Sequence, residues 1–268
     1  MTSHLKRWVT ALVALPALFG IIAYGNLAVF SLLIYLVLIL ALHEFYLMVL
    51  GKVHRLARWL GISTATILYI SIYQGDPRVI LTAASMSVIL IFLFFLWQAR
   101  GQPFAFDLLA RVVLGLFYVA FGFSHLVMIR QLPDGISWIF LVLVLAFAGD
   151  TLAFYAGKAW GKTKLMPTVS PGKTEAGILG LIAGGIIGAL LFKILFLPGL
   201  PVGHALILGF TASIIGQLGD LCESAIKRSI GVKDSGSILP GHGGILDRVD
   251  CLLFIVPFVY YYRLFILS

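Results

Sequence analysis

Four polar residues between positions 220 and 228 have a spacing that suits chemistry. In a helix they share one face, being three or four residues apart: Asp220, Glu223, Ser224 and Lys227. Carboxylates beside a hydroxyl and an ammonium suit a metal ion and a phosphate, since Mg²⁺ takes one or two protein carboxylates and completes its shell with water and substrate oxygens. Ordinary i,i+4 ion pairs at the end of an interfacial helix would explain the same residues without chemistry.

A glycine-rich stretch follows, between Lys233 and Gly244. It contains four glycines and Pro240, which predict irregular backbone. Successive N–H groups in such backbone form concave anion sites, and Lys233 and His242 favour phosphate binding over a merely flexible loop. Just beyond it, Asp247 and Asp250 lie three residues apart. They could cap a helix, but two acids flanking a basic residue at a membrane boundary favour a larger role.

A third polar stretch runs from Asp150 to Thr174. The string Gly172-Lys173-Thr174 invites comparison with a P-loop, but Pro167 stands where that motif requires its first glycine. A basic loop that contacts phosphate remains the prediction. The His43-Glu44 pair, in contrast, is expected to be a structural pairing near the inner end of an apolar run.

Long apolar helices must position these residues. The chain has 268 residues, of which 61% are hydrophobic and 11% charged, against about 45–50% and about 25% in soluble domains. This composition excludes a soluble enzyme and a disulfide scaffold, and it predicts an all-α, polytopic membrane protein. Nine spans are expected, at about 8–25, 27–50, 59–75, 78–97, 108–129, 136–157, 176–198, 202–222 and 249–267.

The basic residues predict the orientation of these spans. With the N-terminus inside, 15 of the 19 Lys and Arg residues fall in inner segments and 4 in outer ones. Such a bias is typical of cytoplasmic loops, so we expect a cytoplasmic N-terminus and an outer C-terminus. The net charge of +8 is then explained by topology, without nucleic acid. Residues 1–135 form an N-terminal membrane region of five spans, and 136–268 a catalytic region with cytoplasmic loops 158–175 and 223–248.

The run from Ser224 to Asp250 resembles the signature of the phosphatidate cytidylyltransferase family, also called CDP-diacylglycerol synthases. That signature is a Ser, a Lys-Arg pair, a Lys-Asp, a His-Gly-Gly and an Asp-Arg-x-Asp at fixed spacing, all present here. The upstream residues from Asp150 to Lys158 and from Ser170 to Thr174 also fit, so the likeness covers about the C-terminal 120 residues. One departure is Ala176 before Gly177, where an acidic or amide residue is expected, and we therefore assign Glu175 no catalytic role.

The resemblance implies three sets of residues. Catalytic residues would be Asp220, Asp247, Lys227, Arg228, Lys233, Asp234, His242 and Arg248. Substrate-binding residues would be Ser170, Lys173, Thr174, Ser224, Gly243, Gly244 and Lys158. Ligands of Mg²⁺, with room for a second cation, would be Asp220, Asp247, Asp250 and Asp150.

The implied reaction joins CTP and phosphatidate into CDP-diacylglycerol and pyrophosphate, in phospholipid biosynthesis. It would take place on the cytoplasmic side of a bacterial inner membrane, in a protein surrounded by lipid, and analogy with the family suggests a homodimer. We expect no dedicated general base, because a phosphate monoester with a second pKa near 6 is largely dianionic at neutral pH. Clustered acids and basic, glycine-rich loops agree with this reaction independently.

Two other classes of protein remain open. A secondary transporter of an anionic solute would tolerate intramembrane acids and broken helices, but the sequence shows no related halves. A lipid kinase or a CDP-alcohol phosphotransferase would share the membrane and the metal. The latter needs an Asp-Gly-x-x-Ala-Arg start, and Asp134-Gly135 is followed by Ile-Ser-Trp instead.

Overall fold

The computed structural model describes residues 16–238 and 243–267, and the protein is helical almost throughout. Within these ranges seven helices are long and apolar enough to cross a membrane. The sequence prediction of an all-α, polytopic membrane protein is therefore confirmed. These helices are α2 (Leu27–Leu50), α3 (Arg55–Gln74), α4 (Pro77–Gln98), a composite helix over Phe106–Gln131, α7 (Gly135–Trp160), α8 (Glu175–Phe196) and α9 (Val202–Ser229).

The seven helices match seven of the nine predicted spans. The spans predicted at the two ends of the chain have no counterpart among these seven helices. The span predicted over 8–25 falls partly outside the described residues, of which 16–24 are helical. The span predicted over 249–267 is divided into a short helix α10 (Leu246–Val249) and α11 (Leu252–Phe265), with a turn between them. The 14 residues of α11 rise about 21 Å, which is less than the roughly 30 Å of a hydrocarbon core.

The polar segment 158–175, predicted as a loop, contains a small antiparallel hairpin. Its strands are β1 (Lys164–Met166) and β2 (Ser170–Thr174), and Lys164 pairs with Thr174. The hairpin leads directly into α8, because Thr174 is both the last residue of β2 and the N-cap of that helix.

The chain forms two compact units that are not divided by a single cut. The first unit comprises residues 1–131 and 234–248, and the second comprises 132–233 and 249–268. The described residues of 234–248, among them Asp247, therefore pack with the N-terminal helices.

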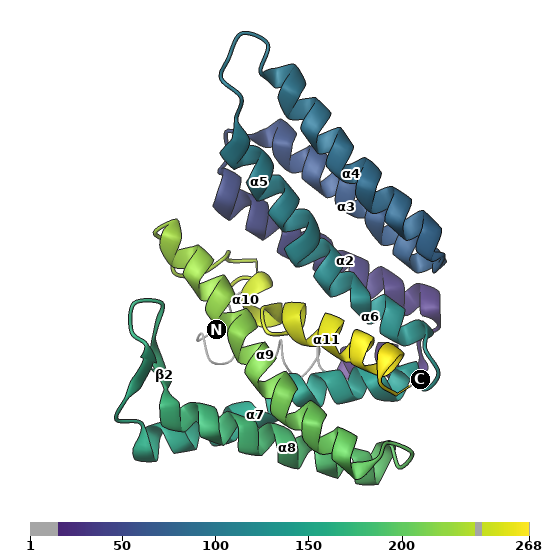
Figure 1. The fold of residues 1–268 in the computed structure, drawn as a ribbon, viewed down its shortest axis with the longest axis vertical. Helices are drawn as coiled ribbons and strands as arrows, with labels where there is room; N and C mark the ends of the chain where they lie inside the picture. Colours follow the sequence, from purple (N-terminus) through teal and green to yellow (C-terminus); the bar gives the residue numbers. More distant parts are fainter. Residues whose placement is uncertain (1–15, 239–242, 268) are drawn as a thin grey trace. The chain divides into compact units, whose positions relative to one another are not determined.

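In the first unit, α2 packs against a helix that changes its winding. That composite helix consists of α5 (Phe106–Leu114), a π-helical segment η1 (Gly115–Phe121) and α6 (Gly122–Gln131) (Figure 1). The ring of Tyr46 on α2 lies where a Cβ on Gly61 or Gly115 would be, and its hydroxyl donates to Val112 O at 2.8 Å. Glycine at both positions thus lets a large side chain fix α2 against its neighbours.

In the second unit, glycines allow α7, α8 and α9 to approach closely. A Cβ on Gly184 would lie 2.7 Å from the Cα of Gly149, and a Cβ on Gly209 would lie 2.6 Å from the Cα of Ile186. Small residues favour such close helix packing in membranes. Figure 1 shows α7 and α8 side by side, with α9 crossing them. This tight frame carries the hairpin and the polar ends of the three helices.

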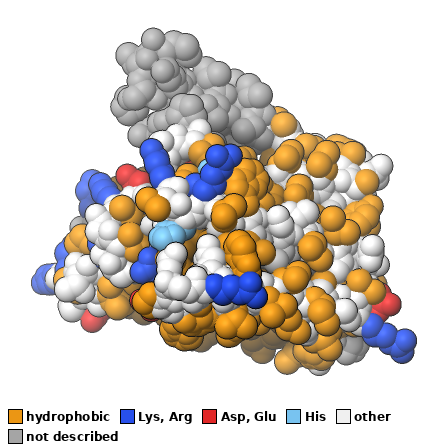
Figure 2. Space-filling view, turned by 90° about the horizontal axis from the view of Figure 1, so that it is seen from above, with side chains coloured by type: hydrophobic (Ala, Val, Ile, Leu, Met, Phe, Trp, Pro, Cys, Tyr) orange, Lys and Arg blue, Asp and Glu red, His pale blue; other side chains and the backbone are white. Residues whose placement is uncertain are grey.

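Large apolar side chains are exposed along the spanning helices. Two examples on the long apolar helix α4 are Leu81, which is 70% exposed, and Leu96, which is 62% exposed. Figure 2 shows hydrophobic side chains over much of one face of the molecule, with Lys and Arg gathered in a few places. Since water would not favour such a surface, these faces contact lipid, and the protein is a multi-pass membrane protein.

Candidate active site

A cavity of about 410 Å³ lies in the second unit, at the C-terminal end of α7. Its wall comes from α7, the hairpin, the first turns of α8 and the middle of α9. Five residues predicted to bind metal or substrate line this cavity: Asp150, Lys158, Lys173, Thr174 and Asp220. Its volume falls in the range of small-molecule sites, which are about 300–1,000 Å³.

Thr174 and three glycines shape the wall of the cavity. The Thr174 hydroxyl accepts a hydrogen bond from Gly177 N at 3.1 Å, so it caps α8. A Cβ on Gly157 would lie 3.0 Å from that hydroxyl oxygen, and one on Gly161 would lie 2.8 Å from it. The buried Thr174 therefore joins the end of α7 to the start of α8, and its hydroxyl is already engaged by the backbone.

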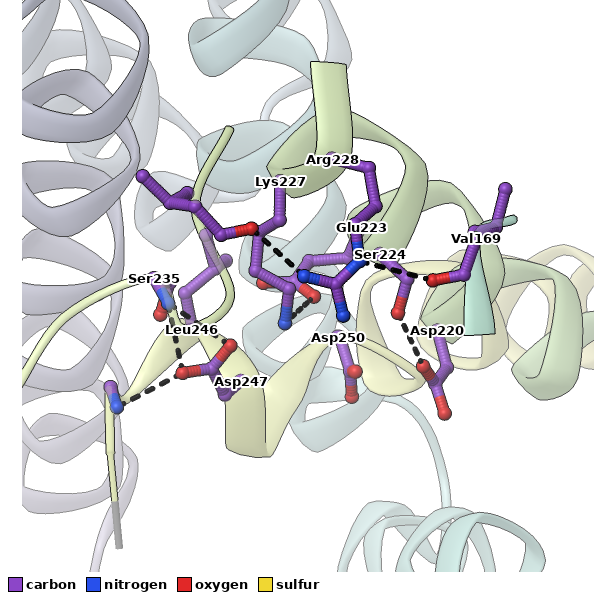
Figure 3. A network of polar contacts seen from close by, with 12 residues as sticks. Val169, Asp220, Glu223, Ser224, Lys227, Arg228, Ser235, Leu246, Asp247 and Asp250 are labelled. Atoms are coloured by element: carbon purple, nitrogen blue, oxygen red, sulfur yellow. Dashed lines mark hydrogen bonds and ion pairs between the residues drawn. The ribbon is translucent and has the colours of Figure 1, made fainter. Parts of the chain in front are cut away.

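Asp220 on α9 is held by two neighbours at the cavity. The Lys173 ammonium from β2 forms an ion pair with its carboxylate. The Ser224 hydroxyl, one turn further along α9, donates to the other carboxylate oxygen at 3.3 Å (Figure 3). The side chains of Lys173 and Asp220 are 21% and 37% exposed, so solvent and solutes reach both.

Glu223 and Lys227 form a buried i,i+4 ion pair on the same helix. Lys227 Nζ lies 2.5 Å from Glu223 Oε2, and the two side chains are 11% and 1% exposed. The i,i+4 pairing considered from the sequence is thus present at these two positions. The exposed Arg228 donates to Val169 O at 3.4 Å and to Val232 O at 3.1 Å, which ties the hairpin turn to the end of α9.

Asp250 joins this group because Gly219 lacks a side chain. A Cβ on Gly219 would lie only 2.9 Å from Asp250 O, so the chain after α10 passes directly against α9. Burial, and then the negative charge of Asp220, raise the pKa of Asp250 to about 7. Burial also raises the pKa of the Cys251 thiol, and the charges of Asp250, Asp150 and Asp220 raise it further. The carboxylates of Asp150, Asp220 and Asp250 therefore lie close enough together to influence the same thiol.

These carboxylates fit Mg²⁺ better than a metal that needs a complete protein cage. Among the described residues no three His, Cys, Asp or Glu side chains form a ready metal site. Mg²⁺ needs only one or two carboxylates, with water and substrate phosphate completing its shell. Burial raises the pKa of Asp250 most, and the negative charge of Asp220 raises it further; a bound cation would offset the repulsion between the two acids.

A separate polar group surrounds Asp247 in the first unit. Its carboxylate accepts hydrogen bonds from Ser235 N, at 3.0 and 3.2 Å, and from Gly244 N at 3.0 Å (Figure 3). Gly243 has a φ of +81°, a conformation that favours glycine. The glycine-rich stretch was predicted to bind anions through its backbone N–H groups. One of these groups, Gly244 N–H, donates to an acid of the chain itself.

Other predicted residues lie at the surface of the two units. Lys233 ends the second unit, and Asp234 begins the segment that belongs to the first unit; both are exposed, as is Arg248 on α10. Ser170, on β2, is half-buried, and it is not among the residues that line the cavity. His242 lies outside the described residues.

Glu44 is a residue whose importance the sequence did not indicate. The structure buries it, and its carboxylate accepts a hydrogen bond from Leu246 N at 3.0 Å. Placing a lone acid in an apolar run costs free energy. That unusual placement was the only feature of the sequence that could have pointed to Glu44.

Comparison with known proteins identifies the family. Residues 5–266 match the profile of the Cytidylyltransferase family. The chain belongs to this family. A protein named phosphatidate cytidylyltransferase from Bacillus subtilis is 34% identical over 97% of this chain and 98% of its own length. Another of that name from Staphylococcus saprophyticus is 35% identical over 94% and 95%, and one from Staphylococcus aureus is 40% identical over 58% of each chain. The family resemblance inferred from the signature is confirmed.

Proposed function

We propose that this protein transfers the cytidylyl group of CTP to phosphatidate, giving CDP-diacylglycerol and pyrophosphate. The observation that carries the proposal is similarity, over nearly the full length of both chains, to proteins named for this reaction. The family does not favour a transporter or a lipid kinase.

The reaction needs charge neutralisation more than proton transfer. A phosphate oxygen of phosphatidate forms a bond to the α-phosphorus of CTP, and the bond between that phosphorus and the bridging oxygen of pyrophosphate breaks. The electron pair leaves with pyrophosphate. The attacking phosphate is largely dianionic at neutral pH, so no general base is required. Repulsion between two polyanions is the main obstacle, and positioning with cationic stabilisation overcomes it.

Residues of the second unit would hold phosphate groups and the metal. Lys173 and Lys158 face the cavity and would contact phosphates, while Ser224 would orient Asp220. Asp220, with Asp250 and Asp150, would hold Mg²⁺, which when bound supplies positive charge to the phosphate oxygens. Since Lys227 is paired with Glu223 and Arg228 ties two segments together, their first contribution would be to fix the end of α9.

The Asp-Arg-x-Asp motif would supply a further acid. Asp247 would be a further metal ligand, and it lies three positions before Asp250 in the sequence. Gly243 and Gly244 would present backbone N–H groups, and His242 would hydrogen-bond the departing pyrophosphate. Lys233, Asp234 and Arg248 would act at the same segment, where Lys233 and Arg248 add positive charge.

We also propose a location and an assembly. The site would face the cytoplasm from a bacterial inner membrane, because 15 of 19 basic residues fall in the segments assigned to that side. Phosphatidate would come from the surrounding lipid. A homodimer is proposed by analogy with the family alone.

The decisive experiment uses purified protein in detergent with phosphatidate and CTP labelled in one phosphate at a time. Label at the α-phosphate should enter the lipid, and label at the γ-phosphate should leave as pyrophosphate. Lipid labelled from the γ-phosphate would instead identify a kinase, and absence of any labelled lipid would refute the proposal. Omitting Mg²⁺ should abolish the transfer.

A further inference from the structure

A buried acid of the first unit lies beside the segment that carries Asp247. Glu44, on α2, is only 2% exposed. Its Oε2 accepts a hydrogen bond from Leu246 N at 3.0 Å and a longer one from Ser235 Oγ at 3.5 Å. Its Oε1 is buried and has no hydrogen-bond partner among the described residues. The partners come from segments about 200 residues further along the chain.

Two glycines adapt this segment to the carboxylate. A Cβ on Gly236 would lie 2.3 Å from Glu44 Oε1, and a Cβ on Gly244 would lie 2.8 Å from Glu44 Oε2. Side chains at either position would collide with the acid. Glycine at positions 236 and 244 therefore lets the backbone at both positions approach the carboxylate of Glu44.

The same residues that contact Glu44 also fix Asp247. Ser235 donates through its N–H to both carboxylate oxygens of Asp247, while its hydroxyl turns to Glu44. Leu246, whose N–H binds Glu44, directly precedes Asp247. Moving the carboxylate of Glu44 would thus move Ser235, which donates to the carboxylate of Asp247, and Leu246, which directly precedes Asp247.

Glu44 itself lies in a buried part of α2. Phe45 and Tyr46, the next two residues of that helix, are fully buried. Removing a carboxylate from water costs several kcal/mol even after relaxation, and an apolar residue would fill the same space at lower cost. A requirement for a hydrogen-bond acceptor with this reach explains why a polar side chain stands here.

We propose that Glu44 is a positioning residue, which holds Leu246 and Ser235 and so sets the orientation of Asp247. The inference rests on the proposed function for its kinetic part. Helix α2 then contributes to the reaction indirectly, through Asp247, although the motifs that resemble the family signature all lie in the C-terminal half.

The length of the side chain is the property to test. Glu44→Asp keeps the charge but shortens the reach by one methylene, and Glu44→Gln keeps the reach and one acceptor oxygen but removes the charge. Tyr46→Phe is the matched control, since it removes a buried hydrogen bond from the same helix without touching the segment. Each variant is purified as the full chain in detergent.

If Glu44 positions the segment, Glu44→Asp should lower kcat by about 10- to 100-fold, as loss of a supporting partner commonly does, with the KM for CTP changed less than kcat. Glu44→Gln should keep at least a third of the wild-type kcat. Hydrogen exchange of the Leu246 amide should be faster in Glu44→Asp and unchanged in Tyr46→Phe.

Two results would overturn the proposal. One is a Glu44→Asp enzyme as active as Glu44→Gln at equal amounts of folded protein. The other is unchanged exchange at Leu246 in Glu44→Asp. The exchange measurement needs no substrate, so it tests Glu44 even if the wild-type protein makes no CDP-diacylglycerol, an outcome that would refute the proposed function alone.

Discussion

Replacing Lys173 by Gln should separate activity from stability. The ion pair between Lys173 and Asp220 is solvent-accessible, with side chains 21% and 37% exposed. Exposed pairs contribute about 0–1 kcal/mol to stability, so unfolding of Lys173→Gln should differ little from wild type. The same ammonium lines the cavity, where the proposed reaction brings two polyanions together. Losing one preorganised donor to developing charge costs about 10²–10³ in kcat, or about 2.7–4 kcal/mol.

The assay for this variant is transfer of α-labelled cytidylyl to phosphatidate, beside thermal unfolding in the same detergent. Lys193→Gln is the control, because Lys193 is a half-buried lysine in the last turn of the same helix that Lys173 precedes. The control should retain activity within about threefold, a change of less than 1 kcal/mol. Lys173 would have no role in neutralising the substrates if Lys173→Gln kept activity within that margin, or if its activity fell only in proportion to loss of folded protein.

Three further predictions address the acids. Asp247→Asn should lower turnover by about two orders of magnitude or more while the protein still inserts and purifies, because the amide oxygen can still accept from Ser235 N and Gly244 N; near-normal turnover would remove Asp247 from the site. Gly219→Ala should cost about 1–3 kcal/mol of stability through overpacking, since its Cβ would lie 2.9 Å from Asp250 O, whereas Gly203→Ala, with no atom within 4 Å, should cost nothing; equal unfolding of the two variants would contradict the close approach. Because the raised pKa of Asp250, about 7, means that a proton competes with a cation, the Mg²⁺ concentration for half-maximal activity should fall as pH rises from about 6 to 8, and a requirement that stayed constant or grew with pH would contradict this competition.

The spanning helices were predictable because local signals mark both their interior and their ends. An apolar run from residue 27 to 50 lies between Asn26, which caps α2 through a 2.9 Å bond from Val29 N, and Gly51 with a φ of +71°. Asp76 and Pro77 start α4 in the same way. Apolar length, caps and helix-ending glycines are all readable without tertiary information.

The remaining differences come from interactions between distant residues. The hairpin formed by 164–166 and 170–174 was missed because Pro171 and Gly172 predict a turn rather than a strand. The last predicted span is interrupted where the chain turns at Asp250 and Cys251, and hydropathy gives no sign of that turn. For Glu44 the sequence predicted a structural pairing but not the partner. One partner is the backbone N–H of Leu246, and a backbone N–H has no residue-type signature.

Within the candidate site, the sequence predicted which residue types cluster better than which atoms they contact. Asp150, Lys173 and Asp220 line one cavity as the motifs suggested. Thr174, predicted to bind substrate, lines the same cavity, and its hydroxyl also accepts the bond from Gly177 N that caps α8. Spacing along a helix fixes a face, but the partner on that face depends on packing that only the folded chain supplies.

The hydrogen bond between Glu44 and Leu246 has a consequence for biogenesis. The two residues are 202 positions apart, so at about 5–20 residues per second the ribosome needs about 10–40 s to deliver the donor after making the acceptor. During that interval α2 enters the bilayer with an acid whose eventual neighbour has not been synthesised. The contact between α2 and Leu246 therefore forms only after residue 246 has been synthesised, long after α2 itself.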